Sequence, residues 1–212
     1  MSEFDFKTEM HLIKLLGIKA RNIEELYENI RIVPLSSIYY HTHRFLKQHH
    51  FLSPEPPNDF AYWIKNALNI KKLAEAVSSI DTVSFDGLKE LRNAILATIY
   101  NYLKNVKTIN NCERGEEFYF MSCQTFVFST GKKANNINEF YEIMKDIDIN
   151  SIYFHIFESR LRLKKKENDF QNWFNEIGEA RIAMKLSNFD PYTMTLDNLR
   201  KKILSIIEDT LK

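Results

Sequence analysis

One half of this sequence resembles the other half, residue by residue and in the same order. The segment SIYYH, which begins at Ser37, matches SIYFH, which begins at Ser151, at an offset of 114 residues. Further matches follow after small changes of the offset: Trp63 with Trp173, then LKELR with LDNLR near the end of each copy. Because such a series is hard to obtain by chance, we predict an internal duplication, which restricts the fold to two similar units.

The limits of the two copies follow from this alignment. We predict a first helical repeat over residues 1–107, a polar linker over residues 108–116, and a second helical repeat over residues 117–212. The 212 residues, 44% of them hydrophobic, are enough to fill two small cores. Only five glycines and five prolines occur, which argues against an all-β or disordered chain.

Apolar residues recur at helical spacing through most of each copy. Asn22 with Glu25 is typical of a helix start, and Asn136 with Glu139 repeats it. The range 88–104 carries apolar residues on one face, as expected for an amphipathic helix. We therefore predict a mainly α fold, an internal duplication of a five-helix unit, with two similar helical halves packed together.

The first element of each copy is the ambiguous one. Residues 4–17 (FDFKTEMHLIKLLG) are predicted as a helix that ends at Gly17, because glycine often follows the last helical residue. The matching residues 118–131 (FYFMSCQTFVFSTG) contain more residues with strand propensity. Whether this element is a helix or a strand stays open at this point.

Charge and cysteine content exclude several classes of protein. The chain has 29 basic and 28 acidic residues, so it lacks the basic excess of a nucleic-acid-binding protein. No apolar run reaches the length of a membrane span. The two cysteines, Cys112 and Cys123, do not form a disulfide framework, and the first residues show no signal-peptide pattern. We expect a cytoplasmic protein without cofactors.

The most specific part of the sequence resembles a known family. The string SIYYHTHRFLKQHHFLSPEPPNDFAYW, together with SIYFH of the second copy, is similar to a prokaryotic family catalogued only as domain-of-unknown-function family 5752. The resemblance covers nearly the whole chain and is strongest over residues 36–63. Because that family carries no assigned activity, substrate or cofactor, the resemblance implies an architecture and no chemistry.

Histidines supply the main candidates for a site, since His41 and His155 occupy the same position in the two copies. One interpretation is that each packs beside the neighbouring tryptophan and donates to a backbone carbonyl. The other is that both converge on one ligand. For a small anionic ligand, the predicted binding residues are His41, His155, Tyr39, Tyr153, His43, Arg44, Arg160 and Arg162.

A metal site is not predicted. His41 and His43 point in different directions on a helix, so they would not chelate together. A third ligand, Glu55 or Asp59, would have to come from the loop that carries His49.

Three other pairs have structural predictions. We expect Asn58 or Asp59 to cap the helix that follows, and we interpret Asp59 and Asp169 as N-caps and not as catalytic acids. The two tryptophans are expected to be core anchors, together with Phe60 and Phe170. We expect Arg92 and Arg200 to pair with acids, for which Asp81 and Asp190 are the candidates.

No motif in the sequence indicates a particular catalytic activity, and whether the protein is an enzyme stays open. We predict a non-catalytic interaction or scaffold protein, with a protein partner or self-association. The alternative is a small anionic-ligand-binding protein or enzyme, with a His/Tyr/Arg site where the two repeats meet.

Overall fold

The structure, a computed structural model, describes residues 2–44, 58–82, 84–85, 87–159, 167–189, 191 and 194–211. Strand β1 (Phe4–Ala20) comes first and strand β2 (Phe118–Ala134) begins the second series of elements. The first helical set follows β1 and contains α1 (Ile23–Ile32), α2 (Leu35–Tyr39), the π-helix η1 (Tyr40–Arg44), α4 (Asp59–Asn66), α5 (Lys71–Ser78) and α6 (Leu88–Leu103). The second helical set follows β2 and contains α7 (Ile137–Asp146), α8 (Ile149–Tyr153), the π-helix η2 (Phe154–Glu158), α10 (Asp169–Glu176), α11 (Ala180–Ser187) and α12 (Leu196–Leu211).

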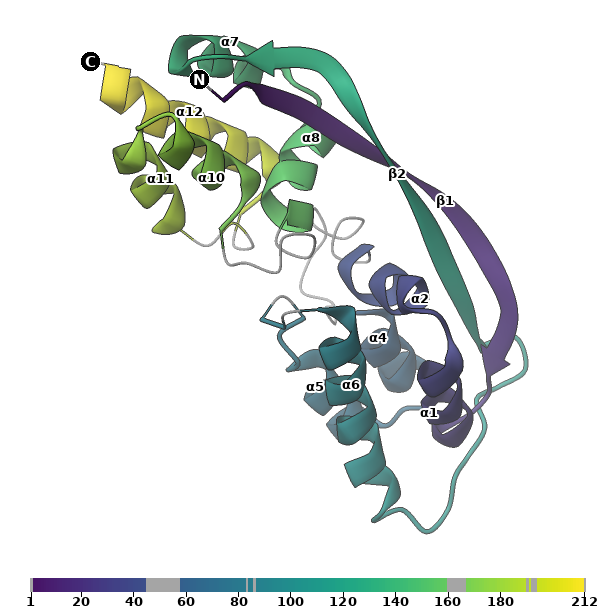
Figure 1. Cartoon of the computed structure of the whole chain (residues 1–212). Helices are drawn as coiled ribbons and strands as arrows, with labels where there is room; N and C mark the ends of the chain where they lie inside the picture. The colour runs from purple at the N-terminus through teal and green to yellow at the C-terminus, as the bar shows by residue number, and fades with distance from the viewer. Residues whose placement is uncertain are drawn as a thin grey trace. The chain divides into compact units, whose positions relative to one another are not determined.

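The two strands correct the predicted fold class. β1 and β2, 17 residues each, pair as an antiparallel two-stranded sheet, here called the ribbon (Figure 1). The fold is therefore α+β, and the prediction of a mainly α chain built from duplicated five-helix units is wrong. Residues 4–17 contain good helix formers, but Phe4 and Phe6 are two apart, a spacing that places both rings on one face of a strand. Packing of these rings outweighs the local helix propensity.

Gly17 also has a different role from the predicted one. It lies inside β1 with a φ of 72°, and Gly131 lies inside β2 with a φ of 77°. This left-handed conformation is strained for residues with a Cβ atom, whereas glycine adopts it readily. Both glycines therefore allow a local bend in a long strand instead of ending a helix.

The chain forms two compact units, and each unit contains part of both strands. Unit 1 consists of Met1–Met10 and Thr125–Lys212, and unit 2 of His11–Gln124. The ranges predicted from sequence are continuous, whereas unit 1 joins the start of the chain to its second half. The second helical set is thus combined with the beginning of β1, and the first helical set with the beginning of β2.

In unit 2, α1, α2 and α5 pack on α6, and α4 packs on α5. Asn22 caps α1 through the Glu25 amide, as predicted. The α6 side chains Leu91, Ile95 and Ile99 are fully buried in this core. The first helical set is therefore an amphipathic assembly around its longest helix.

In unit 1, α7, α8 and α11 pack on α12, and α10 packs on α11. Asn136 caps α7 in the same way as Asn22 caps α1. The prediction that both tryptophans are core residues is confirmed, since Trp63 and Trp173 are buried, and so are Phe60 and Phe170. Within the part of the chain that the structure describes, no helix combines the length and the apolar character needed to cross a bilayer.

Arg92 and Arg200 both donate to backbone carbonyls, and Asp190, the acid predicted for Arg200, lies outside the described residues. Arg92 donates to the Val33 carbonyl oxygen at 2.5 Å, and Arg200 donates to the Ile147 carbonyl oxygen at 2.5 Å. Val33 and Ile147 are the C-cap residues of α1 and α7. The two guanidinium groups therefore bind carbonyls that a helix C-terminus leaves unpaired, where a cation is also favoured by the helix dipole.

Candidate functional site: two strand-docking sites

His41 lies in η1 and holds strand β2 by its backbone. Its Nε2 accepts a hydrogen bond from the Met121 amide at 2.9 Å, and its Nδ1 lies 2.7 Å from Asp59 Oδ2. A backbone N–H can only donate, so Nε2 must be unprotonated and the ring proton must sit on Nδ1. Nδ1–H then donates to the Asp59 carboxylate, which fixes the tautomer and the orientation of the ring.

His155 in η2 makes the same set of contacts in unit 1. Its Nε2 accepts from the Lys7 amide of β1 at 2.8 Å, and its Nδ1 lies 2.8 Å from Asp169 Oδ2. The Ser151 hydroxyl donates to the Lys7 carbonyl oxygen at 2.7 Å. The backbone amide and the backbone carbonyl of Lys7 are therefore both bound by side chains of the second helical set. These are groups that a neighbouring strand would otherwise bind.

Two phenylalanines of each strand fill the space beside the histidine. In unit 2, the Phe118 ring lies 4.7 Å from His41 and 5.3 Å from Phe60, measured between ring centroids. In unit 1, the Phe4 ring lies 4.8 Å from His155 and 5.4 Å from Phe170. The second phenylalanine of each pair is fully buried: Phe6 in unit 1 and Phe120 in unit 2.

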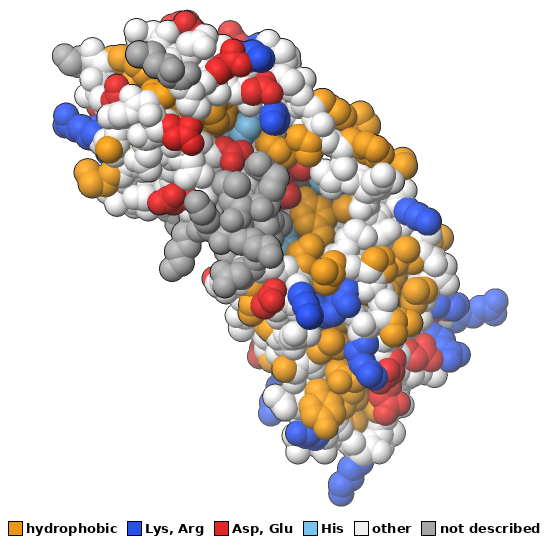
Figure 2. All heavy atoms as spheres, viewed as in Figure 1, with side chains coloured by type: hydrophobic (Ala, Val, Ile, Leu, Met, Phe, Trp, Pro, Cys, Tyr) orange, Lys and Arg blue, Asp and Glu red, His pale blue; other side chains and the backbone are white. Residues whose placement is uncertain are grey.

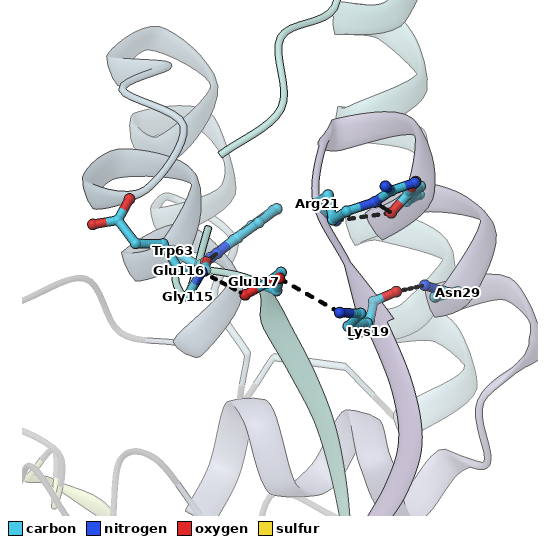
Figure 3. A network of polar contacts seen from close by, with 8 residues as sticks. Lys19, Arg21, Asn29, Trp63, Gly115, Glu116 and Glu117 are labelled. Carbon is cyan, nitrogen blue, oxygen red and sulfur yellow. Dashed lines mark hydrogen bonds and ion pairs between the residues drawn. The ribbon is translucent and has the colours of Figure 1, made fainter. Parts of the chain in front are cut away.

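The tryptophans hold the start of each docked segment. Trp63 Nε1 donates to the Glu116 carbonyl oxygen at 2.6 Å, and Trp173 Nε1 donates to the Ser2 carbonyl oxygen at 2.7 Å. Figure 3 shows the first of these bonds where β2 begins, with Glu117 directed toward Lys19 of the paired strand. Each indole therefore contributes a packed ring and also satisfies one backbone acceptor.

We call these two arrangements the strand-docking sites. The first contains His41, Asp59, Phe60 and Trp63, and the second contains His155, Asp169, Phe170 and Trp173. The predicted N-cap role of the two aspartates is wrong, because Asn58 and Asn168 cap α4 and α10. The aspartates are the next residues, and from the first helical turn they reach back to the histidines.

The contacts assign each histidine to a site of its own. His41 belongs to unit 2 and His155 to unit 1, and each is only 3% exposed. Both nitrogens of each ring are engaged, so neither ring is available as a general base in this state. The expectation that each donates to a backbone carbonyl is also corrected, because each accepts from a backbone amide instead.

The other predicted binding residues pack mainly with aromatic neighbours. Tyr39 stacks on His43, with ring centroids 5.8 Å apart and planes at 3°, and both side chains are buried. In unit 1, Tyr153 stacks on Phe157 at 5.0 Å, so a phenylalanine occupies the place of His43. Arg44 lies over the Tyr40 ring at 5.0 Å. Arg160 and Arg162 lie outside the described residues, as do His49 and Glu55.

Burial changes the protonation of one of these groups. Desolvation lowers the pKa of His43 from 6.5 to about 4, and a hydrogen bond with the Thr82 backbone opposes this shift. The Thr42 hydroxyl lies 3.0 Å from His43 Nδ1. His43 is therefore neutral at physiological pH. Among the described residues, no three His, Cys, Asp or Glu side chains come together as metal ligands would.

Sequence reasoning located the histidines and missed their partners. The strand residues that they bind, Lys7 and Met121, are 148 and 80 residues away in the sequence. One available signal was the Phe-x-Phe spacing at the start of both copies, which is typical of a strand with one buried face.

The fold and the two sites define a class of α+β protein in which helical sets hold extended strands by histidine, aspartate and aromatic side chains. The chain belongs to a family of unknown function, DUF5752, whose match extends over residues 1–208. The structure of OrfY from Thermoproteus tenax is similar, with 28% sequence identity and a TM-score of 0.79, covering 98% of this chain and 95% of that one. No protein with curated annotation matches the chain.

Proposed function

We propose that this protein is a non-catalytic interaction or scaffold protein, which uses its helical sets to hold the ribbon and presents the ribbon to another protein. The observation that carries the proposal is the engagement of both conspicuous histidines in strand docking. The side chains best suited to acid–base chemistry or ligand binding thus serve to position a strand. The alternative, an anionic-ligand site that joins His41 and His155, gains no support from these contacts.

The exposed side chains of the ribbon support this proposal. β1 exposes Met10, Leu12 and Leu15, of which Leu12 is 61% exposed, and β2 exposes Phe126, Val127 and Phe128. Figure 2 shows such apolar side chains gathered along the ribbon. Exposed apolar residues that follow one another on strands are typical of a protein interface, whereas isolated ones are common on any surface.

The proposed partner is a protein with an apolar surface. The balanced charge, net +1, does not favour nucleic acid. Cys112 and Cys123 are not joined in a disulfide, which suits a reducing compartment such as the cytoplasm.

Photo-crosslinking in the source cells tests the proposal. A photoreactive amino acid at position 12 should give one discrete protein adduct, whereas the same group at Lys65, exposed on α4 and outside the ribbon, should give less. The partner identified from this adduct is then purified for binding measurements. Leu12→Lys should weaken its binding at least about tenfold, because it places a charge in an apolar contact. Lys65→Gln should leave binding unchanged.

Equal adducts from both positions, or unchanged binding of the purified partner to the Leu12→Lys variant, would contradict a role of the ribbon as the interaction surface.

A further inference from the structure

The two strand-docking sites hold segments with the same pattern. Residues 3–6 read Glu-Phe-Asp-Phe, and residues 117–120 read Glu-Phe-Tyr-Phe. The glutamate of each segment forms a salt bridge with a lysine of the paired strand, Glu3 with Lys133 at 2.6 Å and Glu117 with Lys19 at 3.4 Å. Two different stretches of sequence therefore share one pattern, Glu-Phe-x-Phe, and lie in two equivalent sites.

Side chains of each site bind the backbone of the segment. In unit 1, Trp173 binds the Ser2 carbonyl, His155 binds the Lys7 amide, and Ser151 binds the Lys7 carbonyl. These bonds require an extended backbone and do not depend on the side chain at the variable position. This explains why Asp5 in one segment and Tyr119 in the other are both accepted.

The segments come from remote parts of the sequence. Lys7 is 148 residues from His155, and Ser2 is 171 residues from Trp173. Over such a separation, the site itself contains nothing that distinguishes the segment of its own chain from that of another copy. A second copy supplies the same phenylalanine rings and the same backbone groups, so an exchange between copies retains every contact within the site.

We infer that each strand-docking site is a binding site for an extended Glu-Phe-x-Phe segment, and that a second copy of this chain supplies such a segment in trans. In this exchanged state, residues 2–10 of one copy occupy the second helical set of the other. The inference goes beyond the proposed function, because it concerns the docking sites and does not involve the exposed side chains of the ribbon.

A peptide experiment tests the binding site. The acceptor is the full chain with Phe4→Asp and Phe6→Asp, which cannot fill its own second site. The probe is a labelled peptide of residues 2–10, SEFDFKTEM, measured by fluorescence anisotropy. The peptide should bind the acceptor saturably and bind the unmodified chain at least about tenfold more weakly, because the site of that chain is already occupied.

Two matched controls separate specific docking from apolar adhesion. A peptide with alanine in place of both phenylalanines should not bind. A peptide N-methylated at the Lys7 backbone nitrogen cannot donate the hydrogen bond that His155 Nε2 accepts. It should bind about tenfold more weakly. That loss should disappear on an acceptor that also carries His155→Phe. If helical circular dichroism shows that the acceptor is unfolded, the single variant Phe4→Ala replaces it.

A folded acceptor that does not bind the peptide would overturn the inference of a binding site. So would an acceptor that binds the peptide without phenylalanines equally well.

A disulfide experiment tests the second copy as the source. Asp5 Oδ1 and Ser129 Oγ lie 2.5 Å apart in unit 1. Chains carrying only Asp5→Cys and chains carrying only Ser129→Cys, both with Cys112 and Cys123 replaced by serine, are mixed and refolded together from urea. Exchange places residue 5 of one copy beside residue 129 of the other, so a mixed disulfide dimer should form. Its yield should rise with protein concentration.

In the control mixture, Lys14→Cys, an exposed position on β1, replaces Ser129→Cys. Absence of the mixed dimer, or an equal yield in the control, would overturn exchange between copies. Both experiments use only this chain and its peptide, so their failure is distinguishable from failure of the proposed ribbon interface.

Discussion

Replacement of His43 by phenylalanine should remove a pH-dependent part of the stability of unit 2. His43 is 6% exposed, and its burial lowers its pKa to about 4 from the ordinary value of 6.5. The unfolded chain therefore takes up a proton near pH 6.5, whereas the folded chain does so only near pH 4. Between these values the unfolded state binds more protons, so the free energy of unfolding falls as the pH falls.

The size of this effect follows from the shift. The difference of about 2.5 pKa units, at about 1.4 kcal/mol for each unit, gives a loss of about 3 kcal/mol between about pH 7 and pH 4. The variant should escape this loss, because phenylalanine does not titrate. It should also pack well, since Phe157 occupies the equivalent place in η2 and stacks on Tyr153.

Urea denaturation at several pH values between about 7 and 4 measures the effect. Other groups that titrate in this range are present in both proteins and cancel in the difference. The stability of the variant relative to the unmodified chain should therefore rise by about 3 kcal/mol as the pH is lowered. A difference that stays constant over the whole range would refute the assignment of a buried, neutral imidazole at position 43.

Three further substitutions have defined expectations. Trp63→Ala should lower the free energy of unfolding by about 3–5 kcal/mol in a denaturant titration, because it removes a buried ring and a hydrogen bond; a loss below about 1 kcal/mol would contradict its core role. Arg200→Met should cost about 1–3 kcal/mol by leaving the carbonyls at the end of α7 unpaired, and equal stability of the two proteins would show that water replaces the guanidinium. Gly17→Ala should cost about 1–2 kcal/mol through its positive φ alone, since no atom beyond residue 17 and its two chain neighbours lies within 4 Å of the added Cβ; a similar loss for Gly131→Ala is the internal check.

Local sequence signals predicted the helices well. Asn22 and Asn136 cap the helices that they were expected to cap, and the apolar spacing of α6 matches its buried face. These features depend on residues within one or two turns, which a sequence displays directly. Predictions that depend on such short distances can therefore succeed without knowledge of the tertiary structure.

The ribbon and the docking contacts could not be obtained in the same way. Residues 4–17 contain many helix-forming residues and yet belong to a strand. The strand is stabilised by the rings of Phe4 and Phe6, which pack against a helical set more than a hundred residues later in the sequence. For Asp59, the neighbouring Asn58 is an equally good cap, so residue type alone could not decide which of the two pairs with His41. Candidate residues were thus found by type, whereas their partners depend on the tertiary fold.

The combination of the first ten residues with Thr125–Lys212 in unit 1 has a consequence for synthesis on the ribosome. The segment with Phe4 and Phe6 is made more than 140 residues before η2 and α10, against which it packs. These non-local contacts slow folding, because a long loop must close before they can form. Unit 1 is therefore completed only after the second helical set has been made, and until then its first strand is an exposed apolar segment that a chaperone or a neighbouring nascent chain can bind.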